Sequence, residues 1–204
     1  MAVMDKSLDH KILSSAKKEF LQYGFAKANL RRICENAGVT TGAVYTRYKG
    51  KNGLFSALVQ DTITALEAKI HTAKQMSPAD STIQSQRENM QFFNGEMLSL
   101  MEFLYAYYDG FRLLRCCAEG SKYFNFLHKF IEDNTDNIWE FLSSNQDKFD
   151  YTIKVDKLEL HLMLTTYWSA IFEPIQHEFS KERAIHYCEI MTDFFSWQSI
   201  LEKK

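Results

Sequence analysis

The sequence predicts an all-α fold, with an N-terminal three-helix bundle that contains a helix-turn-helix and a larger helical C-terminal domain, about nine helices in all. Apolar residues recur every three or four positions through most of the 204 residues, which is the period of an amphipathic helix. Only 2 prolines and 8 glycines interrupt this pattern, and they mark a few short breaks. An apolar fraction of 46% and a charged fraction of 25% are typical of a globular protein with a packed core.

The first helix is expected from about Leu8 to Tyr23, where apolar side chains share one face. Gly24 is expected to end it, because glycine adopts the left-handed backbone of a helix C-terminus at little cost. This helix would pack against the two short helices that follow and complete a three-helix bundle.

The stretch from Asn29 to Lys51, NLRRICENAGVTTGAVYTRYKGK, predicts two short helices joined by a tight turn. Asn29 and Thr40 are N-cap residue types, and each directly precedes a helical pattern. Gly38 lies between the two helices and supplies the left-handed backbone of the turn. Helix, glycine turn and helix is the layout of a helix-turn-helix, whose second helix enters the major groove of DNA.

The same stretch resembles the TetR/AcrR-type regulators of bacteria, whose pattern has a small capping residue, then I-A, A-G-V-S, G-x-L-Y, an aromatic residue and a lysine. The matching residues are Asn29, Ile33-Cys34, Ala37-Gly38-Val39-Thr40, Gly42-Ala43-Val44-Tyr45, Tyr48 and Lys51. The departures are conservative: Asn for Thr, Cys for Ala, Thr for Ser, Val for Leu and Tyr for Phe. The resemblance implies a DNA-binding domain at residues 1–52, with its motif at about 29–48, and a helical regulatory domain at 53–204. It also implies a ligand-responsive repressor that binds a palindromic operator as a homodimer and is not an enzyme.

Charge is distributed unevenly along the chain. Residues 1–55 contain ten Lys or Arg and four acids, a net charge of +6, whereas the remainder has a net charge of −8. A basic N-terminal segment on an acidic remainder is the asymmetry expected when one end of a protein contacts phosphates.

The DNA-contacting residues divide into two groups. By resemblance, the groove-facing residues are Thr40, Thr41, Gly42, Tyr45 and Thr46, whose methyls and hydroxyls can meet thymine methyls or base acceptors. The residues suited to phosphates are Lys27, Asn29, Tyr48, Lys49 and Lys51. Arg31 and Arg47 could each reach a guanine or only a phosphate, and the sequence leaves both open.

Beyond the motif, a long helix is expected from Lys51 to about residue 76, and a second from residues 81 to 108. Asp109-Gly110 is expected to form a turn or kink, and residues 143–154 a loop. The last two helices, within residues 156–202, are apolar nearly all round, so we expect one face of each to pack on a second copy of the chain. The residues expected at this dimer interface are Leu158, Leu162, Thr165, Phe172, Tyr187, Met191, Phe194, Phe195 and Gln198.

The middle of the chain is rich in aromatic residues. The resemblance implies a small apolar or aromatic effector among these helices, with no other cofactor. The candidate pocket residues are Phe92, Phe93, Phe103, Tyr105, Tyr107, Tyr108, Phe111, Phe124, Trp139 and Trp168. Core packing is the alternative role for each of them.

Other classes of protein have weaker support. His128, Glu132, Asp136 and Glu140 would share one helix face, but such a series is more typical of a solvated face than of a metal site, and we expect no metal. No phosphate-binding loop, dinucleotide fingerprint or nucleophile motif is present. A helical dimerisation or adaptor protein, or more distantly an all-helical enzyme, is the alternative function. The cysteine spacing and the lack of a long apolar run favour a cytoplasmic protein without membrane contact.

Overall fold

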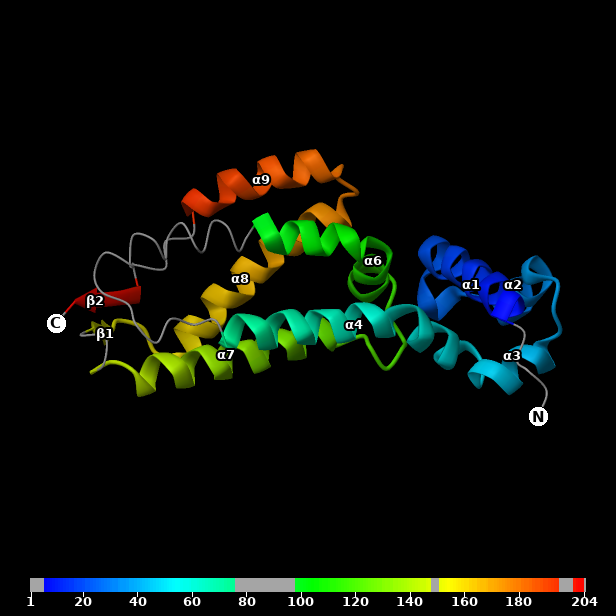
Figure 1. Ribbon diagram of the computed structural model, residues 1–204, viewed down its shortest axis with the longest axis horizontal. Helices are drawn as coiled ribbons and strands as arrows, with labels where there is room; N and C mark the ends of the chain where they lie inside the picture. The colour runs from blue at the N-terminus through cyan, green and yellow to red at the C-terminus, as the bar shows by residue number, and fades with distance from the viewer. Residues whose placement is uncertain (1–5, 76–97, 148–150, 195–199, 204) are drawn as a thin grey trace. The chain divides into compact units, whose positions relative to one another are not determined.

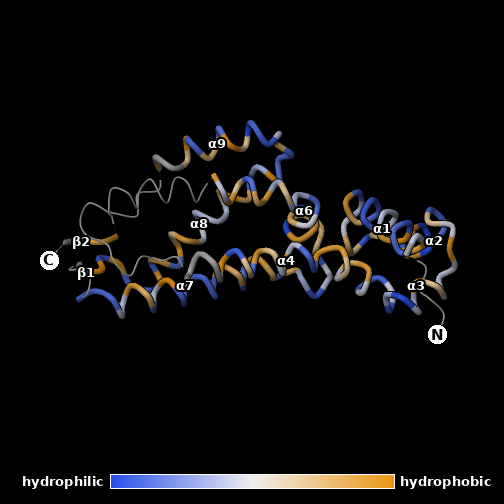
Figure 2. The backbone as a smooth tube through the Cα atoms, viewed as in Figure 1, coloured by the Kyte–Doolittle hydropathy of each residue, from blue (hydrophilic) through white to orange (hydrophobic). Residues whose placement is uncertain are grey.

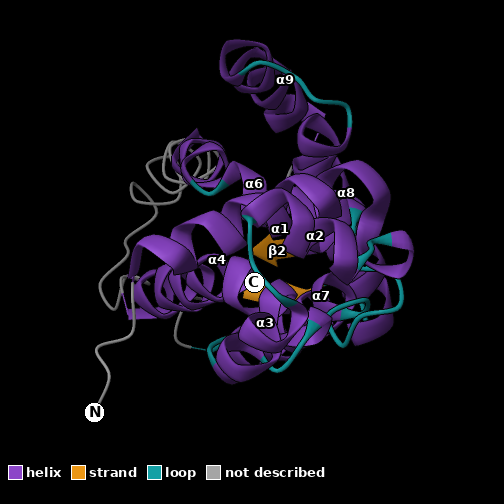
Figure 3. Ribbon diagram, turned by 90° about the vertical axis from the view of Figure 1, so that its right-hand side faces the viewer, coloured by secondary structure: helices purple, strands orange, loops and turns teal. Residues whose placement is uncertain are grey.

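A computed structural model describes residues 6–75, 98–147, 151–194 and 200–203 (Figure 1). The described residues form two compact units. The head unit comprises residues 6–75 and 107–125, and the body unit comprises residues 98–106 and the described residues from 126 onwards. The expected all-α fold is confirmed, and Figure 3 shows helices throughout apart from one pair of short strands.

The head unit is built from five helices among the described residues. They are α1 (Lys6–Lys27), α2 (Leu30–Ala37), α3 (Thr41–Tyr48), α4 (Lys51–Gln75) and α6 (Tyr108–Cys116). Hydrophilic and hydrophobic residues alternate along α1 and α4 in Figure 2, as the sequence pattern requires of helices that bury one face. Gly24 interrupts α1 with φ 72° and ψ 163°, a conformation that is open essentially to glycine alone.

The predicted caps of the helix-turn-helix are present. The Asn29 side chain accepts the Arg31 N–H at the start of α2, and the Thr40 side chain accepts the Ala43 N–H at the start of α3. Gly38 ends α2 in the left-handed conformation, with φ 68° and ψ 36°. The sequence therefore encodes both helix starts and the turn between them locally.

The head unit has an aromatic core. Phe20 of α1 and Phe55 of α4 are fully buried and meet edge to face, with ring centroids 5.1 Å apart. Phe25 packs against both rings. Ile33 of α2 and Val44 of α3 are also fully buried, so every helix of the three-helix bundle contributes to the core.

Helix α6 packs on α1 and α4 within the head unit. Asp109 forms an ion pair with Lys17 of α1 at 2.5 Å. Gly110 lies against Thr62 of α4 so closely that a Cβ at this glycine would overlap the threonine side chain. The expected turn or kink lies at Tyr107, two residues before Asp109-Gly110. Asp109 and Gly110 themselves lie in the first turn of α6, where glycine permits a close helix crossing. The head unit thus extends beyond residue 52. The boundary that the sequence predicts there, between a DNA-binding domain and a regulatory domain, stays a prediction.

The body unit contains helical residues 98–106 and three further described helices. They are α7 (Phe126–Ser144), α8 (Lys157–Gln176) and α9 (Lys181–Phe194). Strand β1 (Tyr151–Ile153) pairs antiparallel with β2 (Leu201–Lys203). The sequence instead predicted a loop over residues 143–154 and helices within residues 156–202. The buried Tyr151 hydroxyl donates to the Leu142 carbonyl and fixes β1 on the end of α7.

In the described part of the chain, no helix is long and apolar enough to span a membrane.

Candidate nucleic-acid interface

Helix α3 presents a polar face made mostly of small side chains. Its exposed residues, with those at its ends, are Thr40, Thr41, Gly42, Tyr45, Thr46 and Lys49. Buried Val44 holds the opposite face of the helix in the core. All five residues expected to face the groove are therefore exposed, four of them on α3 and Thr40 at its N-cap.

The local geometry of this face limits what two of its side chains can do. The Thr46 hydroxyl donates to the Gly42 carbonyl at 2.9 Å, so its proton is used inside the helix. The Tyr45 ring packs over Gly50, whose φ is 93° and where an added Cβ would lie 3.0 Å from the ring. Gly50 thereby allows the turn after α3 to support an exposed tyrosine.

Asp9 of α1 binds two of the predicted DNA-contacting residues. Its Oδ1 accepts hydrogen bonds from Arg47 Nη1 at 2.9 Å and from the Tyr48 hydroxyl at 3.0 Å. The Arg47 side chain is only 14% exposed. Burial, together with the hydrogen bond to Asp9, raises the pKa of Tyr48 to about 12. Both side chains thus anchor the end of α3 to α1, and the sequence reasoning missed Asp9 because only the fold brings it close.

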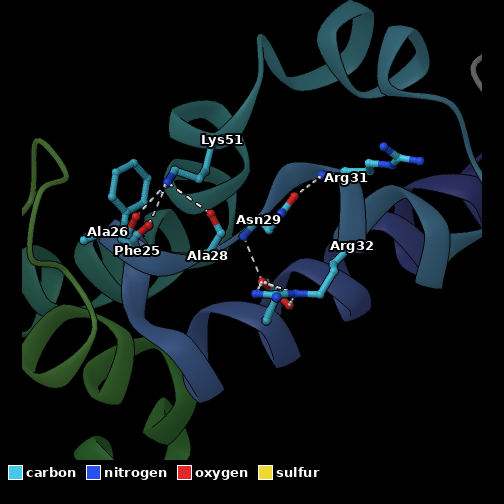
Figure 4. A network of polar contacts seen from close by, with 8 residues as sticks. Phe25, Ala26, Ala28, Asn29, Arg31, Arg32 and Lys51 are labelled. Carbon is cyan, nitrogen blue, oxygen red and sulfur yellow. Dashed lines mark hydrogen bonds and ion pairs between the residues drawn. The ribbon is translucent and has the colours of Figure 1, made fainter.

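Lys51 is engaged with the backbone at the end of α1. Its ammonium donates to the carbonyls of Phe25 at 2.8 Å, Ala28 at 3.2 Å and Ala26 at 3.4 Å, as Figure 4 shows. It also lies 4.6 Å from the centre of the Phe25 ring. An ammonium has three donors, so this geometry occupies all of them. Lys51 therefore stabilises the corner between α1 and α2. The sequence had predicted only a contact between Lys51 and a DNA phosphate.

Glu19 and Arg32 form a clamp between α1 and α2. The Glu19 carboxylate is 4% exposed and accepts hydrogen bonds from Arg32 Nη2 at 2.5 Å, Arg32 Nε at 3.0 Å and the Asn29 backbone N–H at 2.8 Å. Burial alone would raise the pKa of Glu19, but the hydrogen bonds from Arg32 and Asn29 outweigh it and lower the pKa. The guanidinium also stacks 4.3 Å over the Tyr23 ring. The clamp fixes the N-terminus of α2, and sequence reasoning missed it because α1 and α2 residues meet only in the fold.

The remaining basic candidates face solvent. The Arg31 side chain is 83% exposed and pairs with Glu35 one turn later at 2.9 Å, a surface contact of small energy. Lys27 and Lys49 are also exposed. Of the cations predicted to contact DNA, these three can reach backbone phosphates without breaking a buried contact in the described head unit.

The predicted effector residues fall in both units. In the head unit, Phe111 is fully buried and Phe124 is 61% exposed, while Tyr107 and Tyr108 are half-buried. In the body unit, the Tyr105 hydroxyl donates to the Phe179 carbonyl at 2.7 Å, and Trp168 is buried. Phe103 and Trp139 of the body unit are half-buried, and Phe92 and Phe93 lie outside the described residues.

The predicted dimer residues also differ in exposure. Leu158 and Leu162 of α8 and Phe194 of α9 are exposed, and Thr165, Tyr187 and Met191 are half-buried. Phe172 is 2% exposed and packs near Trp168 inside the body unit, so it serves the core of its own chain. Phe195 and Gln198 lie outside the described residues.

The histidines and acids of α7 do not form a metal site in the described part of the chain. His128 Nε2 lies 3.3 Å from the Glu132 carboxylate, and both side chains are exposed. Across the described ranges, no group of three or more His, Cys, Asp or Glu is arranged to hold a metal ion.

Known proteins match the head unit by sequence. The family model described as bacterial regulatory proteins, tetR family, matches residues 12–58. Over 57 residues, the chain is 33% identical to the HTH-type transcriptional repressor Rv1474c of Mycobacterium tuberculosis. That match spans 28% of this chain and 30% of the relative's length.

Solved structures match the fold over nearly the whole chain. A TetR-like transcriptional regulator from Rhodococcus sp. RHA1 aligns with a TM-score of 0.59 at 15% identity, covering 91% of this chain and 93% of that one. The fatty acid degradation regulator FadR from Bacillus halodurans aligns with a TM-score of 0.57 at 13% identity, covering 92% and 99%. At these identities the likeness establishes the fold.

A capped helix-turn-helix with an exposed second helix, in a basic head unit, defines a DNA-binding domain. The family model and the related repressor assign residues 12–58 to the tetR family of bacterial regulatory proteins. The solved structures show that the chain as a whole has the fold of a TetR-like transcriptional regulator.

Proposed function

We propose that this protein is an effector-responsive repressor that binds a palindromic operator as a homodimer. The observation that supports this function best is the exposed face of α3, a helix that Asp9 joins to α1 through Arg47. Glu19 and Lys51 stabilise the start of α2 and the corner between α1 and α2. Repression is suggested by the 33% identity of the head to a transcriptional repressor.

A homodimer is supported by apolar side chains that the body unit leaves uncovered. Leu158 and Leu162 lie one turn apart on α8, and Ile190 and Phe194 lie one turn apart on α9. A soluble monomer rarely exposes several large apolar residues on adjoining helices, and a two-fold axis would bury both pairs. A dimer also supplies two copies of α3, as a palindrome requires.

Leu162→Glu tests the dimer. Sedimentation equilibrium should show a dimer for the wild type and a monomer for the variant, because a buried charge at the interface is strongly unfavourable. Phe141→Glu is the matched control, since Phe141 is an exposed apolar residue of α7. A dimer that survives Leu162→Glu with unchanged affinity rules out this interface.

Effector binding is supported by an unsatisfied donor in the body unit. Trp168 Nε1 is buried and has no hydrogen-bond partner among the described residues. The aromatic rings of Phe130, Tyr167 and Phe172 surround the indole, with centroids 4.9, 5.5 and 6.0 Å away. A buried donor without an acceptor costs about 1–3 kcal/mol, and a ligand with a carbonyl or carboxylate oxygen would recover it.

A panel of aromatic carboxylates and amides tests this. A binding compound should shift the tryptophan fluorescence, and Trp168→Phe should weaken its binding while operator affinity without compound stays unchanged. A compound that releases the operator equally from wild type and from Trp168→Phe places the effector elsewhere.

The central experiment is an in vitro selection with the full-length protein and random duplex DNA, followed by footprinting. Enrichment of a palindrome, with protection of two half-sites about one helical turn apart or somewhat more, supports the function. An adaptor or an enzyme would enrich no sequence, and that outcome refutes the proposal.

A further inference from the structure

We infer that α3 reads an A·T-rich half-site through thymine methyl groups and that Arg47 reads no guanine. This inference rests on the proposed function and specifies the DNA that the same site recognises. It concerns the direct base contacts of α3, because the contacts to phosphates carry no sequence information.

Arg47 would be the natural guanine reader of α3, since arginine paired with guanine O6 and N7 is the commonest specific contact to DNA. The ion pair with Asp9 at 2.9 Å, however, directs its guanidinium towards α1. Asp9 also accepts the Tyr48 hydroxyl, so withdrawing Arg47 would leave a half-buried carboxylate with a weaker partner. Contact with a base would require this network to break, which makes guanine reading unfavourable.

The other cations of the motif are also poorly placed for bases. Recognition helices contact base edges with their N-terminal residues. Lys49 caps the C-terminal end of α3 in a left-handed conformation, with φ 61°. Arg31 belongs to α2, the helix that crosses the DNA backbone in this motif, and it pairs there with Glu35.

The N-terminal part of α3 carries threonine, glycine and tyrosine instead. Thr40 Oγ1 accepts the Ala43 N–H and Thr46 Oγ1 donates to the Gly42 carbonyl, so the helix backbone takes part of the hydrogen-bonding capacity of each hydroxyl. The methyl groups of these exposed side chains are not used in this way and are open to contact with a base. Gly42 adds no side chain between the helix and the bases. Among the four bases, only thymine offers a methyl group in the major groove.

Base analogues in the selected operator test this inference with wild-type protein. Deoxyuridine in place of a contacted thymidine removes one methyl, and burying one methyl is worth a factor of roughly four in affinity. We expect losses of roughly four-fold per contacted thymine, whereas 7-deazaguanine, which lacks the N7 acceptor, should change affinity by less than about two-fold. A loss of roughly ten-fold or more with 7-deazaguanine and none with deoxyuridine would overturn the inference.

Thr41 is the exposed threonine at the first position of α3, where recognition helices contact base edges, so we assign its methyl group to one thymine of the half-site. Combining a change in the protein with a change in the DNA tests this contact. Thr41→Ser removes the Thr41 methyl, so it should lower affinity for the thymine operator and abolish the penalty of deoxyuridine at one position. Thr64→Ser is the matched control, because Thr64 is an exposed threonine of α4 and should leave both affinities unchanged. If every half-site thymine keeps its full deoxyuridine penalty in Thr41→Ser, the proposed contact of Thr41 is refuted.

The outcomes separate this inference from the function on which it rests. A selection that enriches no sequence refutes the proposed function. A selection that enriches a palindrome whose half-sites depend on guanine N7 leaves the function standing and refutes the thymine reading alone.

Discussion

Replacing Lys51 with methionine separates a structural role from a phosphate contact. Methionine keeps most of the length of the side chain but removes the ammonium, which donates to the carbonyls of Phe25, Ala26 and Ala28. Hydrogen bonds to charged groups contribute about 1.5–3 kcal/mol. Lys51 is half-buried and two of its three hydrogen bonds are long, so we expect Lys51→Met to lower the free energy of unfolding by about 2 kcal/mol.

Urea unfolding followed by far-UV circular dichroism measures this decrease. If the free energy of unfolding falls by roughly 2 kcal/mol per molar urea, the urea concentration at the unfolding midpoint should fall by roughly 1 M. Hydrogen exchange of residues 25–34 should accelerate, because the ammonium joins the end of α1 to the start of α4 around this corner. The dependence of DNA affinity on salt concentration should keep its slope, since the variant leaves every phosphate contact in place.

Lys27→Met is the matched control, because Lys27 is an exposed lysine on the same head unit. It should leave the urea midpoint nearly unchanged and lower the salt slope by about one, the change expected when a single lysine no longer neutralises a phosphate. If Lys51→Met lowers the salt slope by about one and leaves the midpoint unchanged, the ammonium binds DNA and the reasoning from the structure is wrong.

Four other substitutions test contacts within the head unit. Gly53→Ala should lower stability by about 1–3 kcal/mol and weaken operator binding, because a Cβ there would overlap the Tyr48 carbonyl at the α3–α4 junction. Gly110→Ala should lower stability by a similar amount in thermal unfolding. Adding Thr62→Ala should restore only part of that loss, because it removes the overlap with Thr62 Oγ1 but leaves the Cβ of residue 62 at 2.7 Å. Glu19→Gln should lower stability by roughly 2 kcal/mol at neutral pH. Since the pKa of Glu19 is lowered in the fold, its contribution is present above about pH 4 and disappears as the pH falls through the folded-state value, so the two proteins should converge in acid.

Gly42→Ala is the control for Gly53→Ala, and the pH dependence of stability is the control for Glu19→Gln. Gly42→Ala adds a Cβ whose nearest atom is Thr40 Oγ1 at 3.8 Å, an ordinary contact, so stability should stay unchanged or rise by up to about 1 kcal/mol. Equal effects of Gly42→Ala and Gly53→Ala would contradict the close-approach argument. A stability gap between wild type and Glu19→Gln that is constant from pH 7 to pH 3 would contradict the role of the Glu19 carboxylate.

Local signals in the sequence were enough to predict the helix-turn-helix. Asn29, Gly38 and Thr40 cap or turn the chain through contacts with residues no more than four positions away, so their roles follow from residue type and spacing. The same reliance on local signals explains why the prediction placed the break at Asp109-Gly110, two residues after its position at Tyr107. Gly110 looks like a turn residue, but it serves a contact with Thr62, which lies 48 positions earlier.

The sequence by itself determined the helices of the helix-turn-helix and the helices on either side of it, because those depend on short-range periodicity and capping. Its motif, by resemblance to a known family, also indicated the class of protein and the residues exposed on α3. Tertiary structure alone decided which basic residues remain available to DNA. Asp9 binds Arg47 across 38 positions, and Lys51 caps carbonyls more than 20 positions away. A cation's role depends on the nearest acceptor in space, and only the folded chain brings that acceptor into reach.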